Sequence, residues 1–152
     1  LFHMTLQEQM KENMKAAMKE RDMAAVTTYR GLMSAMTNAV VAAGKSPDTP
    51  VDDEMAMDVL TKESKKRKDA IQQYEDAGRP ELAEDEKKEL AIIEQYLPEM
   101  MSKDEIRAKA EAKKAELGDD VNKGQLMGAL MGELKGKADG NDVKEVVDEM
   151  LG

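Results

Sequence analysis

The chain has no cysteine or tryptophan, one histidine, one phenylalanine and three tyrosines in 152 residues. The absence of cysteine excludes disulfides, thiolate metal ligands and cysteine nucleophiles. Histidine, the side chain most used in acid–base catalysis and in activating nucleophiles, occurs only at His3. Glu-x-x-His metal sites of helical bundles cannot form either. We therefore expect no metal, no cofactor and no catalytic residue.

Long apolar runs are also absent, and none approaches the roughly 18 residues of a membrane span. The N-terminus does not follow a signal-peptide pattern. Residues 1–3 resemble an expression remnant before a natural start at Met4, in which case His3 and Phe2 are not native. The formal net charge of −9 means that nucleic acid could bind only at a local basic patch. We expect a cytoplasmic, bacterial protein that does not bind membranes.

Helix signals are plentiful. Apolar residues recur every three or four positions, and Thr5 with Glu8 and Ser102 with Glu105 have the form of capping boxes. We expect Asn122 to cap a sixth helix and Asn141 or Asp142 a seventh. The sequence predicts an all-α fold of seven helices over residues of about 6–21, 23–43, 52–77, 80–97, 103–117, 123–134 and 142–150.

The Leu97-Pro98 pair is the best domain boundary, because proline ends one helix and Ser102 opens the next. It predicts an N-terminal helical domain of residues 4–98, with the third and fourth helices as a hairpin, and a C-terminal helical domain of residues 99–152. The second is close to the size at which a hydrophobic core becomes marginal. We expect it to pack on the first domain or to move about Pro98.

Five of the ten glycines recur at every fourth position from 124 to 140. Glycine inside a helix costs about 1 kcal/mol relative to alanine. Gly124, Gly128 and Gly132 form a strip beside the apolar face of the sixth helix, while Gly136 and Gly140 lie in the following loop. The strip either packs closely against a neighbouring helix or receives the backbone of a ligand.

Lys123, Lys135 and Lys137 surround that loop and form a small basic island. Lysines beside exposed backbone are typical of phosphate contacts. A second basic cluster, Lys62, Lys65 and Lys66, lies on one face of the third helix and is either a solvated surface or a further RNA contact. Arg67 is spaced with the apolar residues instead, which predicts a structural arginine paired with a carboxylate of another helix.

The fourteen methionines fall mostly on apolar faces, so we interpret them as core residues rather than as a soft-metal site. The acidic clusters of residues 52–54 and 84–89 lack the spacing of a calcium loop. We assign them no catalytic role.

Three segments resemble the GatB/YqeY family: GQLMGALMGELKGKADGNDV (124–143), the long segment from Lys62 to Ser102, and YRGLMSAMTNA (29–39). The resemblance extends over the chain from Met4. It implies a helical protein of two units whose C-terminal unit is similar to the tail of the B subunit of glutamine-dependent aspartyl/glutamyl-tRNA amidotransferase, a carbon–nitrogen ligase. In that enzyme the tail helps to hold transfer RNA.

Carried over to this chain, the tail-like motif falls on Lys123, Gly124, Gly128, Lys135, Gly136, Lys137, Ala138 and Gly140. Gly132 stands where relatives often have proline. The catalytic body of the amidotransferase has no counterpart, so the resemblance does not imply an enzyme.

We weigh three functions. The first is a non-catalytic accessory that binds transfer RNA or another structured RNA weakly and in a salt-sensitive way, with the amidotransferase or aminoacyl-tRNA machinery as a further expected partner. Its RNA-binding residues would be Lys123, Gly124, Gly128, Lys135, Gly136, Lys137 and Gly140, with Lys62, Lys65 and Lys66. The second is a helical protein–protein adaptor. The third, an independent hydrolase or ligase, lacks a convergent cluster of catalytic groups.

Overall fold

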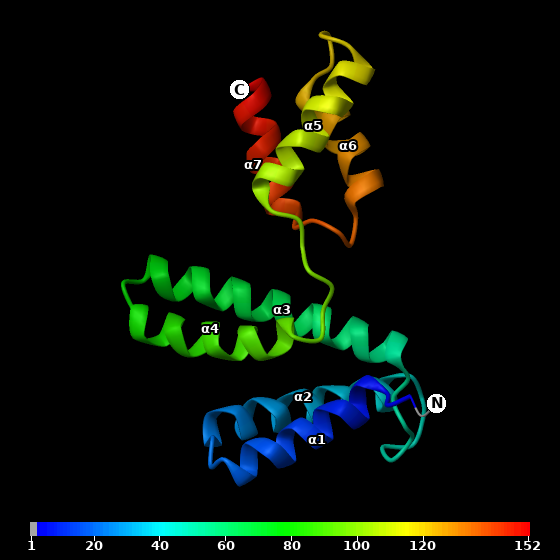
Figure 1. Cartoon of the computed structure of the whole chain (residues 1–152), viewed down its shortest axis with the longest axis vertical. Coiled ribbons are helices and arrows are strands. Elements are labelled where there is room, and N and C mark those ends of the chain that lie inside the picture. The colour runs from blue at the N-terminus through cyan, green and yellow to red at the C-terminus, as the bar shows by residue number, and fades with distance from the viewer. Residues whose placement is uncertain (1–2) are drawn as a thin grey trace. The chain divides into compact units, whose positions relative to one another are not determined.

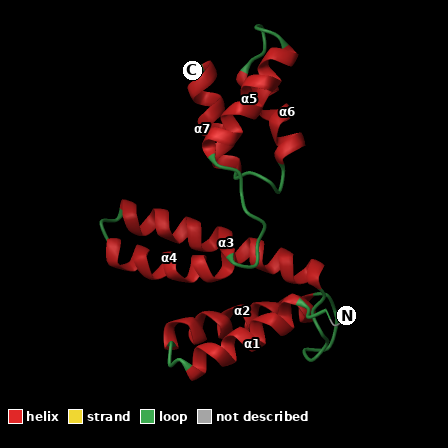
Figure 2. Cartoon of the chain, viewed as in Figure 1, coloured by secondary structure: helices red, strands yellow, loops and turns green. Residues whose placement is uncertain are grey.

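The computed structural model describes residues 3–152, and in that range it contains seven α-helices and no β-strand (Figures 1 and 2). The predicted all-α fold is therefore confirmed. The helices are α1 (Leu6–Lys19), α2 (Met23–Ala42), α3 (Asp53–Asp76), α4 (Pro80–Glu94), α5 (Lys103–Leu117), α6 (Lys123–Leu134) and α7 (Gly140–Leu151).

The chain divides into two compact units, one extending to Leu97 and the other comprising Pro98–Gly152. Each unit has its own hydrophobic core. No helix among residues 3–152 combines the length and the hydrophobicity that crossing a membrane would require.

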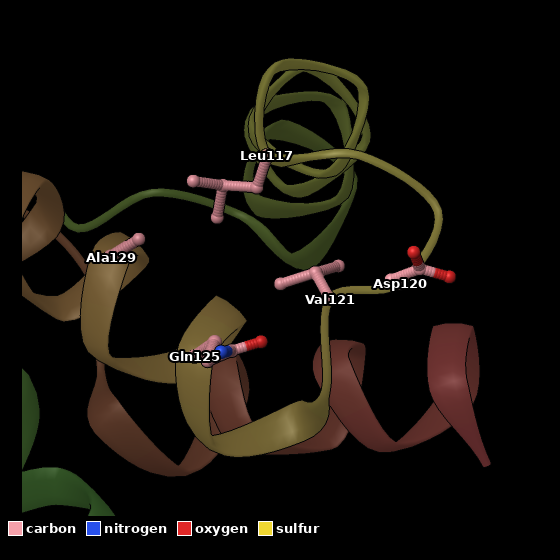
Figure 3. A pocket seen from close by; sticks show the side chains of 5 residues that line it. All are labelled: Leu117, Asp120, Val121, Gln125 and Ala129. Atoms are coloured by element: carbon pink, nitrogen blue, oxygen red, sulfur yellow. The ribbon is translucent and has the colours of Figure 1, made fainter.

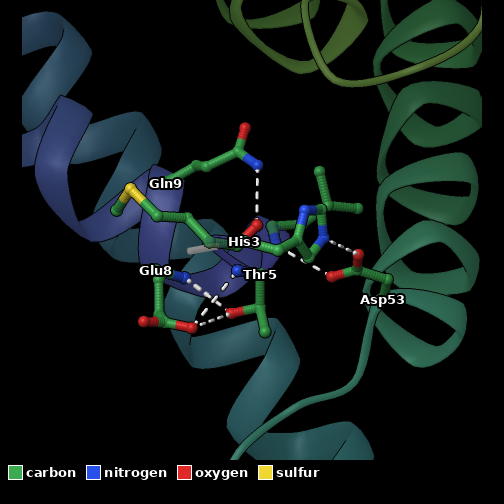
Figure 4. A network of polar contacts seen from close by, with 7 residues as sticks. His3, Thr5, Glu8, Gln9 and Asp53 are labelled. Carbon is green, nitrogen blue, oxygen red and sulfur yellow. Dashed lines mark hydrogen bonds and ion pairs between the residues drawn. The ribbon is translucent and has the colours of Figure 1, made fainter. Parts of the chain in front are cut away.

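Helix α1 begins with the predicted capping box. The Thr5 hydroxyl accepts a hydrogen bond from the Glu8 N–H, and the Glu8 carboxylate accepts one from the Thr5 N–H, each at 3.2 Å (Figure 4). The Leu6 N–H donates to Asp53 Oδ1 at 2.9 Å, which ties the start of α1 to that of α3. This bond is the main reason why the pKa of Asp53 lies below its usual value. Of the expected expression remnant, residues 1 and 2 lie outside the described residues.

The N-terminal unit consists of α1, α2 and the α3–α4 hairpin. The two helices of the hairpin lie side by side, as predicted (Figure 1). The buried side of α2 carries the predicted three-to-four spacing and includes the fully buried Leu32. Tyr96 donates a hydrogen bond to the buried Tyr29 hydroxyl at 3.2 Å and accepts one from the Asn13 amide. Burial, followed by this contact with Tyr96, raises the pKa of Tyr29.

The structure confirms the prediction that Arg67 pairs with a carboxylate of another helix. Its guanidinium lies 3.3 Å from Glu89 of α4 and 3.3 Å from Glu63 of α3. The side chains of Arg67 and Glu63 are only 14% and 11% exposed. The arginine therefore joins the two helices of the hairpin through partly buried ion pairs.

The C-terminal unit is a three-helix unit in which α5, α6 and α7 all contact one another. Its core is aliphatic, and Ile106, Leu126, Leu130, Val143 and Val146 are fully buried. At the start of α5 only half of the predicted capping box forms. The Ser102 hydroxyl accepts from the Glu105 N–H, but the Glu105 carboxylate binds the Ser102 hydroxyl rather than its backbone.

Candidate functional site

The orientation of α6 is set by its buried leucines. Leu126, Leu130 and Leu134 face the core, so the glycine side of the helix is turned outward. The start of α6 is closed by a capping box, as predicted: the Asn122 carboxamide accepts from the Gln125 N–H at 2.8 Å, and the Gln125 side chain accepts from the Asn122 N–H at 3.1 Å. These bonds already satisfy part of the helix N-terminus.

The glycine strip of α6, Gly124, Gly128 and Gly132, is exposed along its whole length. A methyl group placed on Gly128 or Gly132 would meet no atom within 4 Å, and one on Gly124 would meet only the Asn122 side chain at 3.4 Å. Neither α5 nor α7 packs against the strip at Gly128 or Gly132. Packing within the C-terminal unit therefore does not account for glycine there.

The α6–α7 elbow (residues 135–139) begins with a type II β-turn. Lys135 has φ −56° and ψ 126°, and Gly136 has φ +80°. These are the two central conformations of that turn, and the second strongly favours glycine. The Lys137 N–H closes the turn on the Leu134 carbonyl at 2.8 Å. Gly136 thus serves the turn, as the sequence suggested.

The elbow is anchored at its far end. Ala138 is buried, and the Lys137 carbonyl accepts a hydrogen bond from the Met101 N–H at 2.9 Å. The N-cap of α7 is Asp139, which accepts bonds from the N–H groups of the two residues that had been predicted as caps. Gly140 is consequently the first residue of α7 and not part of the loop, so its predicted place in the loop was wrong.

The lysines of the basic island differ in their contacts. Lys135 and Lys137 are exposed and make no ion pair within residues 3–152, whereas Lys123 lies 3.4 Å from Asp148 of α7. Glu133, the nearest acidic residue in α6, is held 3.3 Å from Lys113 of α5. The hydrogen bonds that Lys113 donates to Glu116 and then to Glu133 raise the pKa of Lys113. Within the described part of the chain, the elbow therefore presents two exposed lysines without an ion pair.

The second basic cluster belongs to the N-terminal unit. Lys62, Lys65 and Lys66 are all exposed on α3, as their spacing predicts. Lys66 lies 3.3 Å from the carboxylate of Glu63, while Lys62 and Lys65 have no ion pair in the described part of the chain. A solvated helix surface and an RNA contact are both exposed, so the RNA contact of this cluster stays a prediction.

A shallow hollow of about 380 Å³ lies beside the glycine strip. It is formed where the end of α5 faces α6, and Figure 3 shows Leu117, Val121 and Ala129 bordering it together with the polar side chains of Asp120 and Gln125. Leu117 is 47% exposed. The sequence does not reveal this hollow, because it depends on how the end of one helix meets the side of another.

Comparison with known proteins identifies the family. A family model described as "Yqey-like protein" matches residues 7–151. A protein of Kluyveromyces lactis named "Altered inheritance of mitochondria protein 41, mitochondrial" is 33% identical over 103 residues, covering 66% of this chain and 54% of the relative. The protein of the same name in Lachancea thermotolerans is 36% identical over 104 residues, covering 66% and 53%. This chain thus spans about half the length of these relatives.

A third relative with this name, from Pyrenophora tritici-repentis, is 26% identical over 144 residues, covering 92% of this chain and 77% of its own length. All three names contain the word mitochondrial, so the expectation of a cytoplasmic protein was wrong. An acidic, cysteine-free composition suits any reducing aqueous compartment and cannot tell one from another. These fungal relatives do not support the expected bacterial source either.

The relatives' names mention neither an amidotransferase nor RNA. That part of the resemblance therefore stays a prediction, whereas the match of the family model covers almost the whole chain. On this evidence, the chain belongs to the YqeY-like protein family.

Proposed function

We propose that this protein is a non-catalytic accessory factor that binds structured RNA, and transfer RNA in particular, through the glycine strip of α6 and the α6–α7 elbow. The observation that carries the proposal is an open strip of helix backbone that ends at two unpaired lysines, Lys135 and Lys137. The resemblance of this segment to the tail of an amidotransferase subunit supports the same role. The amidotransferase or aminoacyl-tRNA machinery is the partner class that this resemblance favours.

The binding mode follows from the geometry of the segment. Gly128 and Gly132 have no side chain to hold a sugar–phosphate backbone away from the helix, and Lys135 and Lys137 stand on the turn where that backbone would continue. Contacts of this kind position RNA without reading its sequence. The acidic remainder of the chain, with a net charge of −9, limits binding elsewhere.

The test is the double variant Lys135→Glu with Lys137→Glu. Binding of purified transfer RNA, measured by fluorescence anisotropy at low salt, should be lost. In the unmodified protein, the logarithm of the association constant should fall linearly with the logarithm of the salt concentration. Two phosphate contacts predict a slope of about −1.4 to −1.8.

A matched control is Lys11→Glu with Lys19→Glu, which makes the same charge change on α1. Both lysines are exposed and have no ion pair in the described residues. The control should retain binding. If both double variants lost transfer-RNA binding equally, the loss would be an effect of net charge alone. If the elbow variant still bound transfer RNA, the elbow would not be the binding site.

A protein–protein adaptor is the second candidate, favoured by five large apolar residues that are at least 40% exposed: Met18, Met23, Val41, Met100 and Leu117. Such residues mark contact sites when they cluster. A stoichiometric protein that co-purifies without the absorbance of nucleic acid would favour the adaptor over the RNA-binding role.

A further inference from the structure

The outward side of α2 is unlike the surface of the other helices. Its exposed positions recur every three or four residues along the whole helix, opposite the buried side that contains Val26, Leu32 and Val40. We call this the α2 outer face and define it as Met23, Thr27, Gly31, Ser34, Asn38 and Val41.

The α2 outer face carries no charge. Arg30, at its margin, is the single charged residue among the 20 residues of α2, whereas charged residues make up 36% of the chain. A helix on the surface of a soluble domain normally presents charged side chains to water. Here Met23 and Val41 are instead 58% and 48% exposed. This composition is that of a helix covered on both sides.

We propose that the α2 outer face is the contact between two copies of this chain, packed with their α2 helices antiparallel. The face offers no charge for a different partner to complement, and no other helix in residues 3–152 has so few charged residues. Read in opposite directions, two copies match residue by residue about a two-fold axis near the middle of the helix. Thr27 is opposite Asn38 and Gly31 is opposite Ser34, and the same register places Met23 opposite Ala42 and Val41 opposite Ala24, which are also exposed.

Each opposed pair has compatible chemistry. A methyl group placed on Gly31 would meet no atom within 4 Å, so Gly31 and Ser34 allow the two helices to approach closely at the axis. The Thr27 hydroxyl donates to its own helix at Met23, which leaves its oxygen free to accept from the Asn38 amide. At each end, Met23 of one copy and Val41 of the other lie one residue apart along the contact and would pack together with Ala24 and Ala42. Such a self-matching surface is the requirement for an isologous contact.

The size of the contact predicts a weak dimer. A helix of 20 residues is about 30 Å long, and small residues at its middle bury little area. We therefore expect the contact to bury less than about 1,200 Å², the area at which stable complexes begin. The two Arg30 side chains would lie on the same margin of the seam, where solvent screens their repulsion. The dimer should dissociate on dilution.

Because the chain has no cysteine, introduced cysteines report the register directly. An equimolar mixture of Thr27→Cys and Asn38→Cys proteins, mildly oxidised, should form mixed disulfide dimers faster than either variant forms homodimers. Two homodimers in preference to the mixed species would overturn the antiparallel register.

Sedimentation equilibrium of the unmodified full chain, from micromolar to millimolar, should show a monomer–dimer equilibrium. Ser34→Lys places two like charges near the axis at an exposed position and should give a monomer throughout, with its helical circular dichroism unchanged. Ala16→Lys adds the same charge at an exposed position of α1 and should leave the dimer intact. A monomer at all concentrations in the unmodified chain, as expected if another part of the chain covers α2, would overturn the proposal.

Discussion

Arg21 shows how a single residue can be kept in an unfavourable conformation. It has φ +60°, and it lies at the end of α1 in a cap made by two backbone bonds, Arg21 N–H to Met18 and Asp22 N–H to Ala17. The same cap ends α2 at Gly44 and α3 at Gly78, with φ of +81° and +69°. In this left-handed conformation glycine is favoured and other residues are strained.

Replacing Arg21 with glycine should therefore stabilise the protein. We expect Arg21→Gly to raise the free energy of unfolding of the N-terminal unit by about 1 kcal/mol, measured by urea denaturation. The control is Ala43→Gly, at a C-cap with φ −80° where glycine brings no conformational relief. The control should be neutral or destabilising, and a loss of stability in Arg21→Gly would show that its guanidinium contributes more than the strain costs.

The α3–α4 hairpin shows how two charged helices are joined. Glu63 is the one buried carboxylate among residues 3–152; its Oε2 lies 3.3 Å from Arg67 and Lys66 but makes no hydrogen bond in that range. Burial, followed by the charge of Glu89, raises the pKa of nearby Glu86, although Arg67 opposes that shift. Arg67 therefore balances several carboxylates at one helix interface.

Removing this cation should be costly because the buried Glu63 carboxylate then has the exposed Lys66 in place of the partly buried Arg67 as its nearby cation. We expect Arg67→Met, which keeps an apolar stem, to destabilise the N-terminal unit by about 3 kcal/mol in thermal or urea unfolding. Adding Glu63→Gln should recover part of the loss, and the coupling follows from a double-mutant cycle.

The exposed pair of Arg79 and Glu81, whose side chains are 59% and 61% exposed, provides the comparison. Arg79→Met should cost less than about 1 kcal/mol. If Arg67→Met destabilised the protein no more than Arg79→Met, the ion pairs of Arg67 with Glu63 and Glu89 would contribute no more to stability than an exposed pair.

At the scale of the whole molecule, residues 3–152 form two separate hydrophobic cores. One gathers residues of the N-terminal unit around Leu32 and Leu60, and the other gathers residues of the C-terminal unit around Ile106 and Leu130. A unit the size of residues 98–152 buries a smaller fraction of its surface than a larger domain. The C-terminal unit should be the less stable of the two.

We expect Leu130→Ala, at a fully buried position of α6, to cost about 2–5 kcal/mol and to unfold the C-terminal unit alone. Amide resonances of residues 98–152 should lose their dispersion in NMR spectra while those of the N-terminal unit remain. Leu32→Ala, also fully buried, should affect the N-terminal unit first. Simultaneous loss of both sets of resonances in either variant would mean that the two units unfold as one.

Most of the fold follows from neighbouring residues. The caps at Thr5 and Asn122 and the apolar spacing of α2 could be read from positions three or four residues apart, and Arg67 revealed its structural role by lying in phase with apolar residues. The start of α7 was misplaced because Asp139, Asn141 and Asp142 are all good capping residues. In the structure the cap is Asp139, which follows the buried Ala138, and burial depends on the rest of the unit.

The local sequence determined the seven helices of residues 3–152, where each one ends and which side of it faces the core. The reason is that helix hydrogen bonds and caps join residues at most a few positions apart. Tertiary structure alone determined three other features: the open glycine strip, the hollow at Leu117 and the uncovered α2 outer face. They depend on which helix packs against which side of its neighbour. Glycine at a close helix contact and glycine at an open surface have the same spacing, so only the packed structure could separate them.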